Sequence, residues 1–217
     1  MTHDLTAVQS DQTEEQVRVV AICGSLRTNS YTRLALRVAL EGAAEVGAIP
    51  QLIDLRDYEL VFCHGEEKKR GYPADVHRLR RDVKAAQGII LGTPEYHGGM
   101  SGVLKNALDL MGFDEFEGKM IGLIGVSGGQ MGAVDALNSL RSIGRALHAW
   151  VIPEQVLISQ AWQLFDTSGR LKNEDLANRV KQVGRQVTRF AYLHSSEQAQ
   201  EFLRLWEEAP PNPGGQK

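Results

Sequence analysis

Residues 24–30, with the sequence GSLRTNS, lie between an apolar run and a stretch with helical spacing. This turn contains Arg27 and four short polar side chains, but it contains no acidic residue. The N-terminus of a helix presents unpaired backbone NH groups and the positive end of the helix dipole, which together favour an anion. An arginine adds a charged fork that suits phosphate oxygens. The pattern predicts an anion site, and the alternative is an ordinary helix cap by Asn29 or Ser30 beside a solvated arginine.

The kind of anion follows from what the turn lacks. A P-loop would need the pattern GxxxxGK[ST], and a dinucleotide-binding turn would need GxGxxG, but neither occurs here. Only Gly24 allows the backbone to come close to a ligand, and hydroxyl groups supply most of the remaining donors. These features favour a terminal monophosphate over a pyrophosphate.

A second unusual turn, TPEYHGG, covers residues 93–99. Pro94 restricts its own φ angle and favours an extended conformation at Thr93, so the chain should leave the preceding strand stiffly. Gly98 and Gly99 allow backbone to approach a ligand closely. A rigid loop with free NH groups beside Tyr96 is suited to the edge of a flat heterocycle, and the alternative is a plain tight turn.

A third turn, GVSGGQMGA, covers residues 125–133 and also fits the GxSxG pattern of a hydrolase nucleophile, Ser127. A serine hydrolase could then use His97 in an oxyanion loop and His194 as the base, with Asp166 or Asp175 as the acid. Two features argue against this alternative. His97 and Ser127 fall in consecutive strand–helix units, which is too short a separation, and His194 lies within the closing helix.

The elements that must position these turns alternate along the chain. Strands are expected at residues 17–23, 50–55, 88–96, 119–129 and 150–159, and helices at 32–46, 74–86, 101–111, 133–147 and 173–193. This alternation predicts a doubly wound α/β fold with a five-stranded parallel sheet and helices on both faces. Ligands of such sheets bind outside the carboxyl ends of the strands, where the three turns should lie.

Composition narrows the possible partners and surroundings. The 217 residues suffice for one sizeable domain, and the net charge of −3 provides no basic field for a nucleic acid or an anionic membrane. No apolar run reaches the roughly 18 residues of a membrane span, and the N-terminal residues are acidic and polar, so we expect a cytoplasmic protein. The two cysteines are too few for a disulfide framework and lack the spacing of a metal site.

Both ends of the chain are expected to extend beyond the domain. We expect residues 1–16 to form a disordered tail, residues 17–194 the domain, and residues 195–217 an extension with a short helix followed by a disordered tail. Phe202, Leu205 and Trp206 should give this helix an apolar face. The helix is therefore predicted to dock on its own domain or on a neighbouring subunit.

Three segments, GSLRTNSYTRLAL, PEYHGGMSGVLKNALDLM and SGGQMG, occur in this order on the three turns. Together they resemble the NAD(P)H-dependent FMN reductase family, whose flavodoxin-like flavoproteins include quinone, azo-dye and chromate reductases. The similarity covers residues 17–190. It implies the flavodoxin-like strand order 2-1-3-4-5 and FMN as the cofactor, with NADPH or NADH as electron donor.

The resemblance also implies where the cofactor binds. The residues that match the loop at the FMN phosphate are Ser25, Arg27, Asn29, Ser30 and, at the rim, Tyr31. Those that match the loop along the isoalloxazine ring and ribityl chain are Pro94, Glu95, Tyr96, His97 and Gly98. Those that match the turn at the other edge of the flavin are Ser127, Gly128 and Gly129. This chain departs from the pattern of many relatives, which have Asn-Gly-Ser in place of residues 97–99 and Pro-Gly in place of residues 101–102, and these departures bear on the substrate and not on the flavin.

The implied reaction passes hydride from NAD(P)H through the flavin to a quinone, free flavin or similar small-molecule acceptor, by a ping-pong mechanism at one site. The cofactor carries the chemistry, so no catalytic side chain and no metal are expected. The alternative is a flavodoxin-type electron carrier, although such carriers are usually more acidic than this chain.

The resemblance further implies a homodimer or homotetramer. Five apolar residues between positions 104 and 116 could lie at the subunit contact or pack in the core: Leu104, Leu108, Met111, Phe113 and Phe116.

Overall fold

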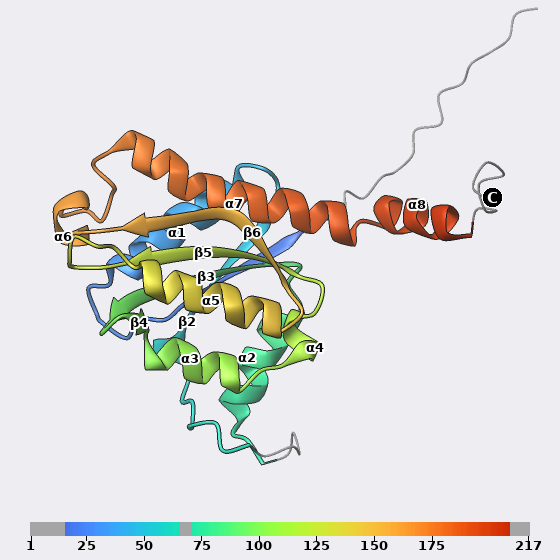
Figure 1. Cartoon of the computed structure of the whole chain (residues 1–217), viewed down its shortest axis with the longest axis horizontal. Coiled ribbons are helices and arrows are strands. Elements are labelled where there is room, and N and C mark those ends of the chain that lie inside the picture. Colours follow the sequence, from blue (N-terminus) through green and yellow to red (C-terminus); the bar gives the residue numbers. More distant parts are fainter. Residues whose placement is uncertain (1–15, 66–70, 209–217) are drawn as a thin grey trace, which may run out of the picture.

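The computed structural model describes residues 16–65 and 71–208, which fold around a twisted sheet covered by helices on both faces (Figure 1). Five parallel strands form the sheet in the order β2-β1-β3-β5-β6. Their bounds are β1 Arg18–Cys23, β2 Ile49–Asp54, β3 Gly88–Tyr96, β5 Met120–Val126 and β6 Trp150–Ile158. The predicted order is confirmed for these strands. The five-stranded parallel sheet is confirmed as well, and one short strand, β4 (Gly99–Met100), adds to it by pairing antiparallel with β3.

The helices fall into two layers, as Figure 1 shows. One face carries α1 (Tyr31–Ala44) and α7 (Glu174–Ser195), and the other carries α2 (Ala74–Lys84), α3 (Gly102–Asp109) and α5 (Val134–Ala146). The sequence patterns did not reveal the shorter helices η1 (Leu55–Asp57), α4 (Phe113–Phe116) and α6 (Ala161–Leu164). A single turn is too short to show helical periodicity. The last helix, α8, spans Glu197–Glu207.

The central strands are apolar along their length because both faces of the sheet are covered. Alternate side chains of β1 enter different cores: Val19 and Ala21 pack towards α1 and α7, whereas Val20 and Ile22 pack towards α2, α3 and α5. Burial on both faces fixes the register of these strands, because a slip of one residue would exchange the two sets of side chains. The carboxyl ends of the parallel strands are thereby held at one edge.

The apolar residues between positions 104 and 116 pack mainly in the core. Leu104, Leu108, Met111 and Phe116 are buried, so they are not available for a subunit contact. Phe113 is the exception, with about half of its surface exposed. The core interpretation was therefore the right one for four of these five residues.

The structure describes only part of the two extensions that the sequence predicts. The helix expected in the extension exists as α8, but none of its residues is buried and it points away from the sheet (Figure 1). Docking on its own domain was therefore a wrong expectation. Of the tail expected at residues 1–16 and the extension expected at residues 195–217, residues 1–15 and 209–217 lie outside the described residues. Among the helices that the structure describes, none has both the length and the apolar character needed to cross a membrane.

Helices α1 and α7 approach each other closely where both lack a side chain. A Cβ atom added at Gly184 would overlap the carbonyl oxygen of Ala39, and one added at Gly42 would overlap that of Lys181. These atoms belong to the backbone, so a small shift of a flexible side chain cannot relieve the overlap. The two glycines therefore allow the helix pair to close over this face of the sheet.

We predict that Gly184→Ala lowers the free energy of unfolding by about 3 kcal/mol, because the helices must separate to accept the methyl group. Urea unfolding followed by circular dichroism measures this change. Gly102→Ala is the matched control, since a Cβ atom at this first residue of α3 meets nothing within 4 Å. Equal stability of the two variants would contradict the proposed close packing.

Candidate functional site

The three unusual turns meet at the carboxyl edge of the sheet. The NH of Gly24 donates to the carbonyl of Gly92 at 2.8 Å, and the hydroxyl of Ser101 donates to the carbonyl of Gly24 at 2.5 Å. The carboxylate of Glu95 accepts a hydrogen bond from the backbone NH of Ala136 at 3.0 Å. These bonds connect the first turn to the second, and the second to the helix that follows the third.

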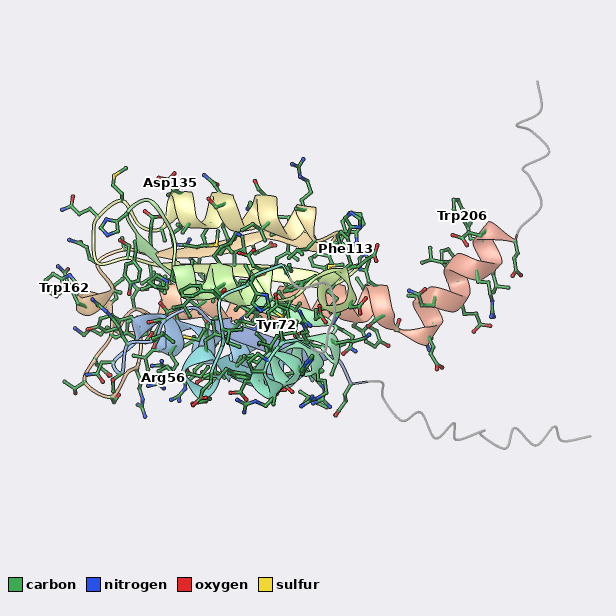
Figure 2. All side chains as sticks on the ribbon, turned by 90° about the horizontal axis from the view of Figure 1, so that it is seen from below. Arg56, Tyr72, Phe113, Asp135, Trp162 and Trp206 are labelled. Atoms are coloured by element: carbon green, nitrogen blue, oxygen red, sulfur yellow. The ribbon has the colours of Figure 1, made fainter. Side chains whose placement is uncertain are left out.

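Labelled side chains locate this edge in Figure 2. Arg56 follows β2, Asp135 lies in the first turn of α5, and Trp162 lies in α6. All three lie towards one end of the domain, whereas Phe113 lies towards the other end, from which α8 extends (Figure 2).

A buried arginine shapes the first turn. The guanidinium group of Arg33 donates hydrogen bonds to the carbonyl oxygens of Ser25, Arg27 and Thr28 at 3.0–3.1 Å. Its Nε atom also donates to the carboxylate of Asp54 at 2.6 Å. Arg33 is only 5% exposed, so these bonds form away from solvent. The arginine therefore draws three carbonyl groups of the turn inward.

The backbone NH groups of the same turn are left available. Within the described part of the chain, the NH groups of residues 25–32 donate no hydrogen bond. The side chain of Ser30 caps α1 by accepting from the NH of Arg33 at 3.1 Å. A concave run of unpaired NH groups at a helix N-terminus is an anion-binding arrangement. The geometry therefore fits the anion site that the sequence predicted, and Ser30 additionally serves as the helix cap.

Arg33 was not among the predicted site residues. The sequence did contain a signal, because Arg33 has the spacing of the buried residues Leu36 and Leu40 on α1. A charged residue at a buried helix position requires a partner. Asp54, the last residue of β2, is that partner, and its place at the carboxyl end of the neighbouring strand could have suggested the pair.

The pKa of Asp54 reflects the two arginines that contact it. Burial alone would raise this pKa, but hydrogen bonds from Arg56 and Arg33 outweigh that effect and lower it from 3.8 to about 2. Asp54 thus stays ionised behind the turn. Its negative charge is compensated by both guanidinium groups, so it does not repel an anion in front of the turn.

The other predicted residues of the first turn differ in their exposure to solvent. Ser25 is buried, whereas Arg27 and Asn29 are exposed. The ring of Tyr31 stacks on that of Phe165 with 5.4 Å between centroids. Tyr31 therefore connects the rim of the first turn to the loop after α6.

The second turn is a tight hairpin between β3 and β4. Its two central residues, His97 and Gly98, have φ angles of 52° and 73°. Positive φ at both positions is typical of a type I′ turn, in which Asn-Gly is the preferred pair. The plain-turn alternative is thus correct for the backbone, and the hairpin leaves the side chains of Tyr96 and His97 exposed. Pro94 is buried within β3, where its backbone pairs with that of Val126.

The side chain of Glu95 contacts helix α5. Its carboxylate accepts from an NH group in the first turn of α5, which is a helix-capping interaction. The side chain therefore holds the hairpin against α5.

The third turn is held by hydrogen bonds of Ser127. The Ser127 hydroxyl accepts from the NH of Gly129 at 2.9 Å, and its carbonyl accepts from the NH of Ala161 at 3.1 Å. Gly128 and Gly129 are exposed. The turn therefore exposes backbone that is held in place by these bonds.

The geometry excludes the serine hydrolase alternative. The Nδ1 atom of His194 donates to the carbonyl of Phe190, and the ring lies near Trp150, the first residue of β6, at the amino edge of the sheet. Ser127 follows the carboxyl end of β5, so a whole strand separates the two residues. No histidine among the described residues forms a hydrogen bond with Ser127.

We predict that the Asp54 pair makes stability depend on pH in acid. The pKa of Asp54 is lower in the folded chain than in the unfolded chain, so its stabilisation is complete above about pH 4 and is lost as pH falls towards 2. The loss should amount to about 2 kcal/mol. Urea unfolding between pH 5 and 2.5 should show this slope in the wild type and a shallower slope in Asp54→Asn. Parallel pH profiles would contradict the assignment.

Comparisons with known proteins identify the family of this chain. A family model described as NADPH-dependent FMN reductase matches residues 17–163. An NADPH azoreductase of Bacillus sp. strain OY1-2 is 44% identical over 142 residues, which are 65% of this chain and 76% of that protein. An NAD(P)H-dependent FMN reductase of Pseudomonas aeruginosa is 34% identical over 176 residues, covering 77% of this chain and 91% of that protein.

Solved structures support the fold. FerB, a flavoenzyme NAD(P)H:(acceptor) oxidoreductase from Paracoccus denitrificans, matches with a TM-score of 0.68 at 21% identity, covering 82% of this chain and 98% of that chain. The apo form of an NADH:FMN oxidoreductase matches with a TM-score of 0.66 at 22% identity, covering 84% and 92%. By its family match and its sequence identity to curated relatives, the chain belongs to the NADPH-dependent FMN reductase family.

Proposed function

We propose that this chain binds FMN at the carboxyl edge of its sheet and reduces a small-molecule acceptor, such as a quinone or free flavin, with NADPH or NADH. The observation that carries this proposal is the first turn, where Arg33 binds the carbonyl groups and leaves the NH groups of residues 25–32 unpaired. Family membership supports the same conclusion.

The first turn fits a phosphate group in both charge and donors. It contains no acidic side chain, and the nearby Asp54 is paired with two arginines. We assign the phosphate to the backbone NH groups of the turn and to the side chains of Ser25, Arg27 and Asn29. Ser30 contributes through its NH, because its hydroxyl already accepts from the NH of Arg33.

The second and third turns fit the edges of a flat ring. We assign the ring and ribityl chain to Pro94, Glu95, Tyr96, His97 and Gly98, with Glu95 acting through its backbone because its carboxylate caps α5. We assign the other edge of the ring to the backbone of residues 127–129. Hydrogen-bond donors held in place before the reaction stabilise charge at little reorganisation cost.

When bound, FMN supplies the redox chemistry by accepting hydride from NAD(P)H and passing electrons to the acceptor. The residues of this chain bind and orient it. No side chain is required as a nucleophile, a general acid or a metal ligand. The exposed hairpin residues lie at a single edge of the sheet. We therefore propose that NAD(P)H and the acceptor bind one after the other at the same site, which gives ping-pong kinetics.

Purified protein should show the absorbance bands of oxidised flavin, alone or after incubation with FMN, and should release FMN on denaturation. It should also oxidise NADPH or NADH steadily with a quinone, and double-reciprocal plots at several quinone concentrations should be parallel. Protein that stays colourless with excess FMN would contradict the proposed function. Flavin reduction too slow to sustain turnover would instead favour the electron carrier.

We predict that Arg27→Ala weakens FMN binding by roughly 1.5 to 3 kcal/mol, the range of a charge-assisted hydrogen bond. Titration of FMN into apoprotein, followed by quenching of flavin fluorescence, measures the dissociation constant. Arg37→Ala is the matched control, because it removes the same exposed charge from α1 farther from the turn. An unchanged affinity in Arg27→Ala would remove this residue from the site.

A further inference from the structure

The segment that follows β6, residues 160–172, connects the third turn of the site with the first. At its start, the NH of Gln160 donates to the carbonyl of Gly129 in the third turn at 3.1 Å. Further along, the ring of Phe165 stacks on that of Tyr31 at the rim of the first turn. The segment after β6 therefore lies along the carboxyl edge of the sheet, where we have proposed that FMN binds.

This segment is held in place along its length. Gln160 has a φ angle of 46°, a left-handed conformation that turns the chain sharply just before α6. Ala161 and Phe165 are buried. The NH of Lys172 donates to the carbonyl of Leu164 at 2.9 Å, so the chain closes back onto the end of α6. The side chains that α6 exposes are therefore presented from a fixed backbone.

Trp162 is the large aromatic side chain that this segment leaves in solvent, with 59% of its surface exposed. Among the described residues, no hydrogen bond or ring contact involves its indole. Figure 2 places Trp162 at the same end of the domain as Arg56 and Asp135, which is the end that carries the site. An exposed aromatic face on a fixed backbone is a surface on which a flat ring can stack.

An ammonium group lies at the same helical turn. The Nζ atom of Lys172 donates to the carbonyl of Gln163, the residue next to Trp162, at 2.9 Å. An ammonium group has three NH donors, so this bond leaves two of them for other acceptors. Lysine binds phosphate as a point charge. An aromatic face beside such a charge fits the base and a phosphate group of one nucleotide.

The acidic side chains nearest along the chain are engaged in other interactions. The carboxylate of Asp166 accepts from the NH groups of Ser168 and Arg170 and from the hydroxyl of Ser168, at 2.7–2.9 Å. Glu174 and Asp175 lie in the first turn of α7, where they complement the positive end of the helix dipole. The segment after β6 itself carries two basic side chains and one acidic side chain, so its charge favours an anion.

We infer that Trp162 and Lys172 bind the adenosine half of NADPH, with the adenine on the indole and the 2′-phosphate at the ammonium group. NADPH differs from NADH by that phosphate, so Lys172 determines which donor the chain prefers. A quinone could stack on the indole but has no phosphate for the lysine, whereas NADPH uses both side chains. The inference rests on the proposed function, because the donor must bind beside the FMN site.

Calorimetric titration of the full chain, saturated with FMN, tests this subsite without turnover. The wild type should bind adenosine 2′,5′-bisphosphate about tenfold more tightly than adenosine 5′-monophosphate, because the ammonium group meets the additional phosphate. Lys172→Gln should remove this difference. Trp162→Ala should weaken both ligands about tenfold, which is the order of the effect of base stacking on an aromatic side chain.

Matched control variants remove the same side chains at the amino edge of the sheet. Trp150, at the start of β6, is 62% exposed, and Lys84 ends α2 with an exposed side chain. Trp150→Ala and Lys84→Gln should therefore bind both nucleotides as the wild type does. Thermal unfolding by circular dichroism identifies a variant that fails to fold. If Trp162→Ala fails, Trp162→Leu replaces it, because leucine keeps an apolar side chain without a flat ring.

Steady-state kinetics extend the comparison to the whole donor. Lys172→Gln should lower the ratio of kcat/KM for NADPH to kcat/KM for NADH about tenfold. Equal binding of the two nucleotides by the FMN-loaded wild type, or an unchanged donor ratio in Lys172→Gln, would overturn the inference. So would a Trp162→Ala variant that raises the KM for a quinone but not for either donor. Protein that does not bind FMN would instead contradict the proposed function.

Discussion

The site depends on one buried ion pair. Arg33 has its charge compensated by Asp54 and directs its remaining donors to carbonyl groups of the first turn. A buried charge without such partners would be very costly, and removing one member of a buried pair typically costs about 3 to 5 kcal/mol. The arrangement therefore fixes which way each peptide group of the turn points. An ordinary capped helix would leave these carbonyl groups to solvent, where they would repel an anion.

The parallel sheet and a few side chains hold the other two turns in fixed positions relative to the first turn. Gly24 comes so close to β3 and α3 that an added Cβ atom would lie 2.8 Å from that of Leu104. Ser101 connects the first turn to the second through its hydroxyl group. Glu95 then holds the second turn to α5. These contacts connect the three turns to one another. The backbone groups that would bind a ligand across the turns are therefore positioned before the ligand binds.

Sequence patterns predicted the strands well because burial on both faces demands continuous apolar runs, as in residues 88–94. They also picked out the first and second turns as unusual, and the structure brings both turns to the carboxyl edge of the sheet. They missed Arg33, because its partner Asp54 is distant in sequence and only the β1–β2 pairing brings the two together. They also missed β4, since a two-residue strand shows no alternation, although His97-Gly98 matches a known hairpin preference.

The most direct test of the account compares FMN with riboflavin, which lacks the phosphate group, in the wild type and in Arg33→Gln. Their dissociation constants come from fluorescence titration, and thermal unfolding shows how far the variant is destabilised. If Arg33 keeps the turn in its phosphate-binding form, the wild type should prefer FMN strongly, and this preference should largely disappear in the variant while riboflavin affinity changes little. A variant that keeps the wild-type ratio of the two affinities would contradict the account.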